Sequence, residues 1–449
     1  MNTAQSEPGY PNPAYAWYVV VILFLAYTLA YIDRQVIALL VEPIKRDLQI
    51  NDTQISLLQG FAFVIFYTIT GIPLGRLADR KNRRLIIAAG ILLWSIMTAV
   101  CGLARNFWSL FAARVGVGIG EACLSPAAYS MIADLFPKAK RGVPISFYAM
   151  GVYCGAGMAF IVGGFVIELV SRAEEIVLPV IGVVHPWQMT FFIVGIPGLI
   201  LVAIMLLTVK EPPRHELVMT GGVVQQLSFR DSAGYFFSRW RTYGLAYLGY
   251  SLKATLSYGY FAWIPSMYIR TFGWSAGKIG LVFGLIVAVL GTLGILLGGI
   301  LVDRMVARGR YDSYLKISVY GAIGAMLFGI PAVLVPNPYL SLLFLCPTIA
   351  CLGTSVGLAP GAINFITPNE LRGLAIGAYV FVVALISISC GPTSVALITD
   401  YVYRDPNAIR YSLAIFTLGF GIIACCVLLL GIKPFLGSVD EMLAKETRT

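Results

Sequence analysis

Long stretches without a single charged side chain recur along this chain, and they restrict its fold more than any other feature. Examples are Thr53–Gly75, Leu85–Ala104 and Ile279–Val302. A helix needs about 20 largely apolar residues to cross the hydrocarbon core of a bilayer. Because 58% of the residues are hydrophobic and only 12% are charged, the composition excludes an ordinary soluble domain. We therefore expect an all-α membrane protein.

Twelve transmembrane helices are expected once the spans that carry a few buried charges are added. The uncharged run Ile317–Asn369 is long enough for two of them, and Pro336-Asn337-Pro338 divides it. The expected spans are residues 16–46, 53–79, 83–104, 106–134, 141–170, 187–209, 241–271, 276–303, 313–335, 338–366, 371–400 and 408–433.

Two motifs occur twice in the chain. Gly75–Arg80 (GRLADR) matches Gly299–Arg304 (GILVDR), and Phe136–Gly142 matches Thr367–Gly373. The interval between the two copies is nearly the same for both motifs. Because six spans then separate equivalent positions, the halves should be two pseudo-symmetric six-helix bundles of the same orientation. We predict an N-terminal bundle at residues 1–210, a cytoplasmic linker at 211–240 and a C-terminal bundle at 241–449.

The basic residues are distributed unevenly between the expected loops. If the N-terminus is cytoplasmic, the inner loops and tail hold twenty Lys and Arg and the outer loops hold eight. This bias predicts that both termini are cytoplasmic, and it accounts for the net charge of +10 without a nucleic-acid partner. The first apolar run has no basic n-region and is as long as a full span, so we expect no cleavable signal peptide.

Four ionisable residues lie inside apolar stretches of the first half: Asp33, Arg34, Arg114 and Glu121. A charge at this depth costs roughly 2.5–3.5 kcal/mol on insertion scales, so such residues tend to face a wet cavity or one another. Arg114 and Glu121 are seven residues apart and should share one helix face, about 10 Å apart. Asp33 and Arg34 are adjacent and cannot both face one partner.

These residues suggest proton coupling. Burial raises the pKa of an acid and a nearby guanidinium lowers it, so a carboxylate that changes its pairing between two conformations also changes its proton affinity. We predict Asp33 and Glu121 as proton-coupling acids, with Arg34 and Arg114 as their partners or as a site for an anionic head group. The alternative is a static salt-bridge network. Lys253, in the seventh span, either adds a second cation for the substrate or extends toward the cytoplasmic surface.

The segment Gly75–Arg84 (GRLADRKNRR) resembles the signature loop between helices two and three of the major facilitator superfamily, with Asn82 where that pattern usually has Gly. Arg114–Ala122 (RVGVGIGEA) and Tyr31–Arg34 (YIDR) are similar to the Spinster branch of that superfamily. This resemblance implies a bacterial homologue in the inner membrane that transports lysophospholipids or sphingoid lipids by alternating access. The YIDR motif also resembles the anion:cation symporters that carry sugar acids.

The resemblance further implies a cytoplasmic gate. Asp79 and Asp303 would each meet the N-terminal end of a helix in the other half, where the helix dipole favours a carboxylate by about 0.3–1 kcal/mol. Gly75 and Gly299 would allow two helices to approach closely. The expected gate residues are Gly75, Asp79, Arg80, Arg83, Arg84, Arg141, Gly299, Asp303 and Arg304.

The sequence predicts no enzyme, no ATP-driven pump and no cofactor, because it contains no nucleophile elbow, metal-ligand cluster or phosphate-binding loop. The glycines in Gly116-Val-Gly118-Ile-Gly120 lie mid-span without a preceding strand, which favours close helix packing over nucleotide binding. We expect a monomeric, proton-coupled secondary transporter of an amphipathic lipid, with a small organic anion as the alternative substrate. A channel or passive facilitator is less compatible with paired intramembrane acids and bases.

Overall fold

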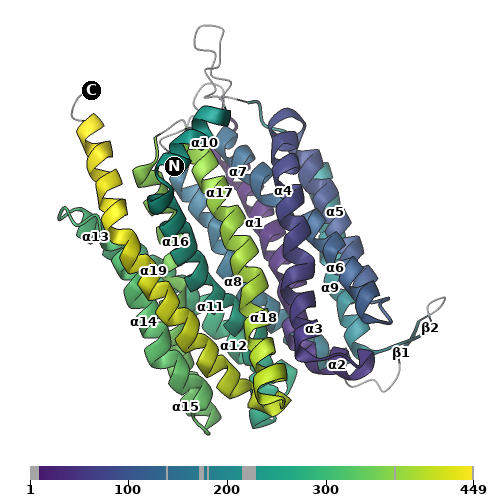
Figure 1. Cartoon of the computed structure of the whole chain (residues 1–449). Helices are drawn as coiled ribbons and strands as arrows, with labels where there is room; N and C mark the ends of the chain where they lie inside the picture. The colour runs from purple at the N-terminus through teal and green to yellow at the C-terminus, as the bar shows by residue number, and fades with distance from the viewer. Residues whose placement is uncertain are drawn as a thin grey trace, which may run out of the picture. The chain divides into compact units, whose positions relative to one another are not determined.

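The computed structural model describes residues 10–137, 140–170, 176–178, 182–214, 229–368 and 371–446, and it is almost entirely helical (Figure 1). Within these ranges, eleven helices are long and apolar enough to cross a membrane. A twelfth, α11 (Trp240–Phe272), has 33 residues, but it carries Lys253 and many Ser and Tyr side chains. The all-α membrane fold predicted from the sequence is confirmed.

The chain forms two compact units. The first contains Met1–Met219 together with Trp274–Ala288, and the second contains Thr220–Gly273 together with Val289–Thr449. The helices of the first unit are α1 (Pro13–Gln35), α2 (Val41–Leu48), α3 (Asp52–Ser56), α4 (Ala62–Arg80), α5 (Arg83–Cys101), α6 (Phe107–Glu121), α7 (Leu124–Leu135), α8 (Gly142–Val170), α9 (Pro186–Thr208) and α12 (Ala276–Ile286). Strands β1 (Ile176–Leu178) and β2 (Gly182–Val184) pair antiparallel, with Val177 opposite Val183.

The second unit is built in the same way. Its helices are α10 (Phe229–Ser238), α11, α13 (Thr292–Val306), α14 (Ser313–Leu334), α15 (Pro338–Gly353), α16 (Ser355–Ile366), α17 (Arg372–Val383), α18 (Ser389–Leu397) and α19 (Ile409–Glu446). The predicted domain boundaries at residues 210 and 240 stay a prediction. Of the predicted linker, residues 215–228 lie outside the described ranges.

The span boundaries agree with the sequence except at the two ends of the chain. The first predicted span continued to residue 46, but α1 ends at Gln35 and passes through the 3-10 helix η1 (Val36–Leu39) into the separate amphipathic helix α2. The last predicted span stopped at residue 433, but α19 continues to Glu446 because Phe435 and Val439 beyond it are fully buried.

Helix ends reproduce the internal repeat. Asn106 and Asn337 each begin a helix, because the side chain accepts hydrogen bonds from backbone N–H groups of the first turn. These two residues are as far apart in the sequence as Phe136 and Thr367, the first residues of the repeated motif. That interval also separates Leu124 from Ser355, where α7 and α16 begin after a break in the span.

Two arginine contacts are related by the same interval. Nε of Arg141 donates to the carbonyl oxygen of Phe136 at 2.8 Å, and Nε of Arg372 donates to that of Thr367 at 3.1 Å. The repeat predicted from the sequence is therefore present in specific hydrogen bonds and not only in helix count.

Glycines allow the closest helix contacts of the first unit. A Cβ at Gly284 of α12 would lie 2.6 Å from the carbonyl oxygen of Gly157 in α8, and one at Gly280 would lie 2.5 Å from that of Phe160. No side chain fits at such distances, so α8 and α12 can pack backbone to backbone.

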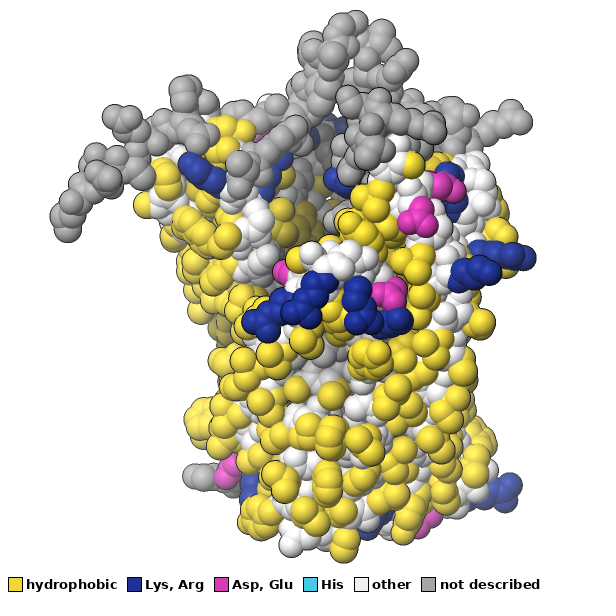
Figure 2. All heavy atoms as spheres, turned by 90° about the vertical axis from the view of Figure 1, so that its left-hand side faces the viewer, with side chains coloured by type: hydrophobic (Ala, Val, Ile, Leu, Met, Phe, Trp, Pro, Cys, Tyr) yellow, Lys and Arg dark blue, Asp and Glu magenta, His cyan; other side chains and the backbone are white. Residues whose placement is uncertain are grey.

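The outer surface and the interior of the second unit are both apolar. Leu296, Leu297, Leu327 and Leu343 are exposed side chains of α13, α14 and α15. On the face seen in Figure 2, apolar side chains cover a broad zone below a band of Lys and Arg at mid-height, with a few more basic side chains at the lower edge. Such a surface is suited to lipid.

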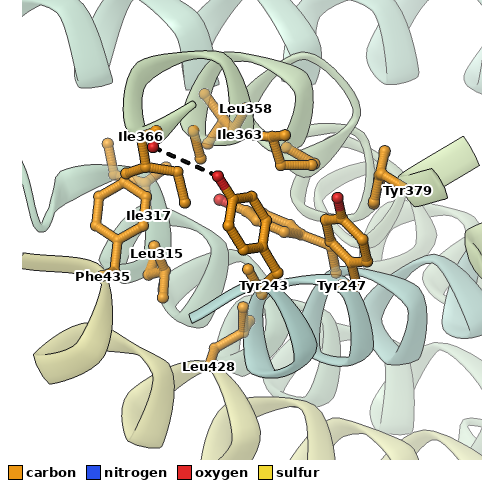
Figure 3. Packing of buried hydrophobic residues seen from close by; sticks show 14 of the residues in the cluster. Tyr243, Tyr247, Leu315, Ile317, Leu358, Ile363, Ile366, Tyr379, Leu428 and Phe435 are labelled. Carbon is orange, nitrogen blue, oxygen red and sulfur yellow. Dashed lines mark hydrogen bonds between the residues drawn. The ribbon is translucent and has the colours of Figure 1, made fainter. Parts of the chain in front are cut away.

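Inside the second unit, a buried cluster joins α11, α14, α16, α17 and α19. Figure 3 shows Tyr243 and Tyr247 of α11 in this cluster, together with Ile363 of α16 and Leu428 of α19. Because the cluster includes one face of α16, it fixes that half-helix to the rest of the unit.

Candidate transport site

An ion pair buried in the first unit joins α1 to the end of α6. Nη2 of Arg34 lies 2.5 Å from Oε2 of Glu121, and the two residues are only 7% and 3% exposed. The Arg34 guanidinium also lies 4.2 Å from the ring centroid of Phe63 and 4.7 Å from that of Tyr31, with Tyr67 at 5.7 Å. Aromatic faces attract a cation when water is excluded, so the rings hold Arg34 in place independently of Glu121.

Arg114 binds backbone instead of a carboxylate. Its Nη1 donates to the carbonyl oxygen of Asp33 at 2.9 Å, its Nη2 donates to that of Arg34 at 3.2 Å and its Nε donates to that of Leu58 at 3.3 Å. The side chain is fully buried. Arg114 therefore connects α1 to the chain segment that precedes α4.

The local backbone explains why these carbonyls are available. Asp33 and Arg34 belong to the last turn of α1, whose final C=O groups lack partners within the helix. Leu58 lies in the π-helical turn η2 (Leu57–Phe61), where the regular hydrogen-bond ladder is also interrupted. A planar guanidinium has several N–H donors, so one arginine can bind the free carbonyl oxygens of both segments at once.

Asp33 has no ion pair within 4.0 Å among the described residues, although it is only 2% exposed. Its Oδ1 has no hydrogen-bond partner in the described structure, and the indole of Trp94 lies beside the same carboxyl group. Both amide atoms of Gln59, in η2, are likewise buried without a partner. Sequence reasoning missed Trp94 and Gln59, because a single Trp or Gln in an apolar span has no distinctive pattern.

The glycines between Arg114 and Glu121 position α6 by close packing, as predicted. A Cβ at Gly118 would lie 2.3 Å from the carbonyl oxygen of Phe63, and one at Gly120 would lie 2.7 Å from the backbone nitrogen of Trp94. The glycines thus bring α6 against α4 and α5, the helices that supply the aromatic and indole groups of the site.

Lys253 lies in the second unit, whereas the four buried charges lie in the first. It is fully buried in α11, and its Nζ donates to Oγ1 of Thr354 at 2.6 Å and to Oγ of Ser355 at 2.5 Å. Among the described residues, it forms no ion pair within 4.0 Å. In this conformation its ammonium group is directed to hydroxyl groups at the break between α15 and α16.

Arg83 is the centre of a second charged cluster, in the first unit. Its buried guanidinium forms ion pairs with Asp134 and with Glu211, the latter at 2.7 Å, and it donates to the carbonyl oxygen of Pro212 at 3.0 Å. The backbone N–H of Arg84 donates to the other Glu211 oxygen at 2.9 Å. These contacts fasten the chain that follows α9 to the start of α5 and the end of α7.

Sequence reasoning named Arg83 and Arg84 for a gate but missed their partners Asp134 and Glu211. Arg214 was also missed, and it donates to the carbonyl oxygens of Ala78 and Lys81 at 2.8 Å. The signal available was the charged pair in Glu211-Pro212-Pro213-Arg214, directly after the sixth span.

The other predicted gate residues are more exposed or make looser packing contacts. Arg80, Asp303 and Arg304 are not buried, and the side chain of Asp79 lies outside the described part of the chain. A Cβ at Gly75 would meet Pro126 at 3.8 Å, an ordinary contact, and nothing described in its own unit lies within 4 Å of one at Gly299. The gate itself stays a prediction.

No group of three or more His, Cys, Asp or Glu side chains in the described ranges is arranged to hold a metal ion. A pocket of about 280 Å³ occurs in the first unit, but Asp47, Arg105, His185 and Trp187 line it, and none of the four buried charges does. The four charged residues themselves are buried in this conformation.

Each of the two units is a bundle of long apolar helices. Interrupted spans and buried charges inside such bundles are typical of a multi-pass membrane transporter. The sequence profile of the Major Facilitator Superfamily matches residues 23–392. The chain therefore belongs to the Major Facilitator Superfamily.

Spinster proteins are among its structural neighbours. A crystal structure of a bacterial homologue of the human lysosomal transporter Spinster superposes with a TM-score of 0.81 at 27% identity, covering 97% of this chain and 99% of that one. The sphingosine-1-phosphate transporter SPNS2 of Danio rerio is 26% identical over 62% of this chain and 55% of its own length. The resemblance to the Spinster branch is confirmed.

Two further relatives are bacterial transporters. An MFS-type efflux pump of Mycolicibacterium smegmatis is 30% identical over 88% of this chain and 87% of its own length. The probable galactarate/D-glucarate transporter GudP of Bacillus subtilis is 29% identical over 68% of this chain and 69% of its own length.

Proposed function

We propose that this transporter is a proton-coupled secondary active carrier that moves an amphipathic lipid, a lysophospholipid or a sphingoid-type lipid, by alternating access. The observation that supports the proposal best is the buried pair Arg34–Glu121 beside Asp33, a carboxyl group without an ion pair among the described residues. A static network would be expected to pair both acids, because an unpaired buried charge is costly.

Protonation of Glu121 is the proposed coupling step. A protonated Glu121 no longer attracts the Arg34 guanidinium, whose contacts with Phe63 and Tyr31 are retained. Arg34 then has donors available for an anionic head group, since a guanidinium binds phosphate or carboxylate with two parallel hydrogen bonds. Release of the substrate restores the pair and discharges the proton. Asp33 is proposed as the second acid that binds a proton.

Access to the site must change during this cycle. Asp33 and Glu121 are only 2% and 3% exposed, so neither acid can exchange protons readily in this conformation. A rocking motion of two bundles about a midplane site supplies the second conformation in transporters of this type. The predicted cytoplasmic gate residues, Asp79 and Asp303 among them, are proposed to close that side alternately.

The sequence indicates Arg114 and Lys253 as further candidate cations, for the substrate or for the acids. Arg114 is occupied by three carbonyl groups and Lys253 by two hydroxyl groups. Each would need a change of conformation before it could bind a head group. Arg34 is therefore the first cation to test.

The lipid substrate is supported by the relative named as a sphingosine-1-phosphate transporter and by the Spinster-like structural neighbours. An anionic head group fits Arg34, and the second half has Leu345 and Leu352 at the positions equivalent to Arg114 and Glu121, which suits a lipid tail. We further propose a monomer in the bacterial inner membrane with both termini cytoplasmic.

The test is transport in proteoliposomes with an imposed pH gradient. Uptake of a labelled lysophospholipid and a sphingoid phosphate should depend on the gradient and should collapse with a protonophore. Glu121→Gln and Asp33→Asn should each remove the pH dependence, whereas Asp440→Asn, which changes an exposed acid of α19, should not. Gradient-independent flux of either lipid in the unmodified protein would overturn proton coupling.

A small organic anion such as a sugar acid is the second candidate, because the Bacillus subtilis relative is named as a galactarate/D-glucarate transporter. The same vesicles should be offered labelled galactarate with unlabelled lipid as competitor. Saturable, gradient-driven galactarate uptake without lipid uptake would favour the sugar acid and overturn the lipid proposal.

A further inference from the structure

The tenth span of the chain is broken in its middle. α15 ends at Gly353 and α16 begins at Ser355; Thr354 between them keeps right-handed helical dihedrals (φ −53°, ψ −32°), so the interruption lies in the hydrogen-bond ladder and the chain does not turn away. A break leaves C=O groups at the end of the first helix and N–H groups at the start of the second without intrahelical partners. The two helices need other contacts to keep a fixed angle.

Lys253 supplies contacts on both sides of this break. Its ammonium group donates to the hydroxyl of Thr354, which itself donates to the carbonyl oxygen of Cys351 at 2.8 Å, and to the hydroxyl of Ser355. One cation thus reaches the end of α15 through Thr354 and the start of α16 directly. A positive group at a helix C-terminus is also favoured by the helix dipole.

Helix α14 lies directly against the lysine ammonium group. A Cβ added at Gly321 of α14 would lie 2.5 Å from Nζ of Lys253 and 2.4 Å from Oγ1 of Thr354. On the other side, a Cβ at Gly298 of α13 would lie 2.7 Å from the carbonyl oxygen of Thr354. Glycines on α13 and α14 therefore form the walls around the break.

Both arms of the interrupted span pack against α11, α13 and α14, and α16 also packs against α17 and α19. α16 is held by the apolar cluster of Figure 3, through Ile363 and Ile366, and a hydrogen bond of 2.9 Å joins Tyr243 to Thr367 just after its C-terminal end. α15 packs chiefly against α14. The contacts of Lys253 with Thr354 and Ser355 act at the point where the two arms join.

The first unit has an equivalent arrangement. Its broken span is α6–α7, the counterpart of α15–α16 in the internal repeat, and Arg34 from α1 binds Glu121 at the end of α6. α1 and α11 are each the first spanning helix of their half. A cation from the first helix thus reaches the break in the fourth helix of each half, but only the first half has an acid there.

We propose that Lys253 is a positioning residue: it holds the break between α15 and α16 at a fixed angle and thereby sets the transport rate, without binding the substrate. The inference rests on the transport function, but it concerns a contact within one unit. Loss of hydrogen bonds to a charged donor should slow a conformational step about tenfold, with little effect on substrate affinity.

Three kinds of variant should give the same result if this is correct. Lys253→Met removes the ammonium, Thr354→Val with Ser355→Ala removes its acceptors, and Gly321→Ala displaces Nζ while leaving every polar group present. Each should lower the maximal rate about tenfold and change KM less than about twofold. Lys433→Met, a lysine of α19 that is not fully buried, is the matched control.

Non-additivity is the decisive kinetic readout. Lys253→Met combined with Thr354→Val and Ser355→Ala should be no slower than either alone, because all three changes remove one interaction. Strictly additive losses would overturn the proposal. A raised KM for anionic lipid at an unchanged maximal rate in Lys253→Met would also overturn it, since that result marks a substrate cation.

A structural measurement keeps the test independent of transport. Spin labels on Leu343 of α15 and Asn364 of α16, both exposed, report the angle between the arms. The distance distribution should be narrow with Lys253 present and broader in Gly321→Ala and in the Thr354→Val, Ser355→Ala variant. Unchanged distributions would overturn the positioning role even if the transported substrate had been misassigned.

Discussion

Arg34 and Glu121 face each other at 2.5 Å between α1 and α6, and both are almost fully buried. Removal of one partner from such a pair leaves a buried charge without compensation, which typically costs about 3–5 kcal/mol. Replacement of both partners by apolar residues can be nearly neutral. The pair can therefore be tested for stability separately from transport.

We expect Glu121→Ala to lower the unfolding temperature of the purified protein strongly, because Arg34 is left as a buried cation. Arg34→Met with Glu121→Met should recover most of the loss while transport remains abolished. The measurement is thermal unfolding in detergent. A double variant as unstable as Glu121→Ala would show that the pair itself stabilises the fold.

Arg114→Lys should destabilise the protein nearly as much as Arg114→Met. Lysine keeps the charge but has no planar fork that can reach the three carbonyl groups of Asp33, Arg34 and Leu58. Arg105→Lys, at an exposed position before α6, should have no effect on thermal unfolding. Full stability of Arg114→Lys would mean that charge alone matters at this position.

Arg83→Met should loosen the chain that follows α9. The variant removes the ion pair to Glu211, which lies in that segment. It also removes the ion pair to Asp134, near the end of α7. We expect faster tryptic cleavage after Lys210 or Arg214, measured by limited proteolysis. Arg308→Met, at an exposed position between α13 and α14, should leave the cleavage rate unchanged. Equal rates in both variants would contradict the assigned tether.

Gly118→Ala should prevent normal packing of α6 against α4. The new Cβ would lie 2.3 Å from the carbonyl oxygen of Phe63, and backbone must move to admit it. Overpacking of this kind costs about 1–3 kcal/mol or more. Gly419→Ala, where nothing lies within 4 Å, should be tolerated. Comparable yields of folded protein from the two variants, measured by size-exclusion chromatography, would contradict the prediction.

The sequence by itself determined the class of fold. Long uncharged stretches require helices because a bilayer offers no hydrogen-bond partners to the backbone. The repeated motifs located the internal symmetry, which helix ends such as Asn106 and Asn337 reproduce. The buried charges Asp33, Arg34, Arg114 and Glu121 were identifiable because ionisable residues at this depth are costly.

Only the tertiary structure decided which charge meets which partner. Spacing along one helix could not show that Arg34 binds Glu121 while Arg114 binds carbonyl groups, because those partners come from other helices and from an interrupted backbone. It could not show that Lys253 reaches a helix break, or that Glu211 binds Arg83. Pairing between distant segments depends on how each helix is rotated and how closely it packs. In this chain the glycines of α6, α13 and α14 determine both, because they allow the close helix contacts.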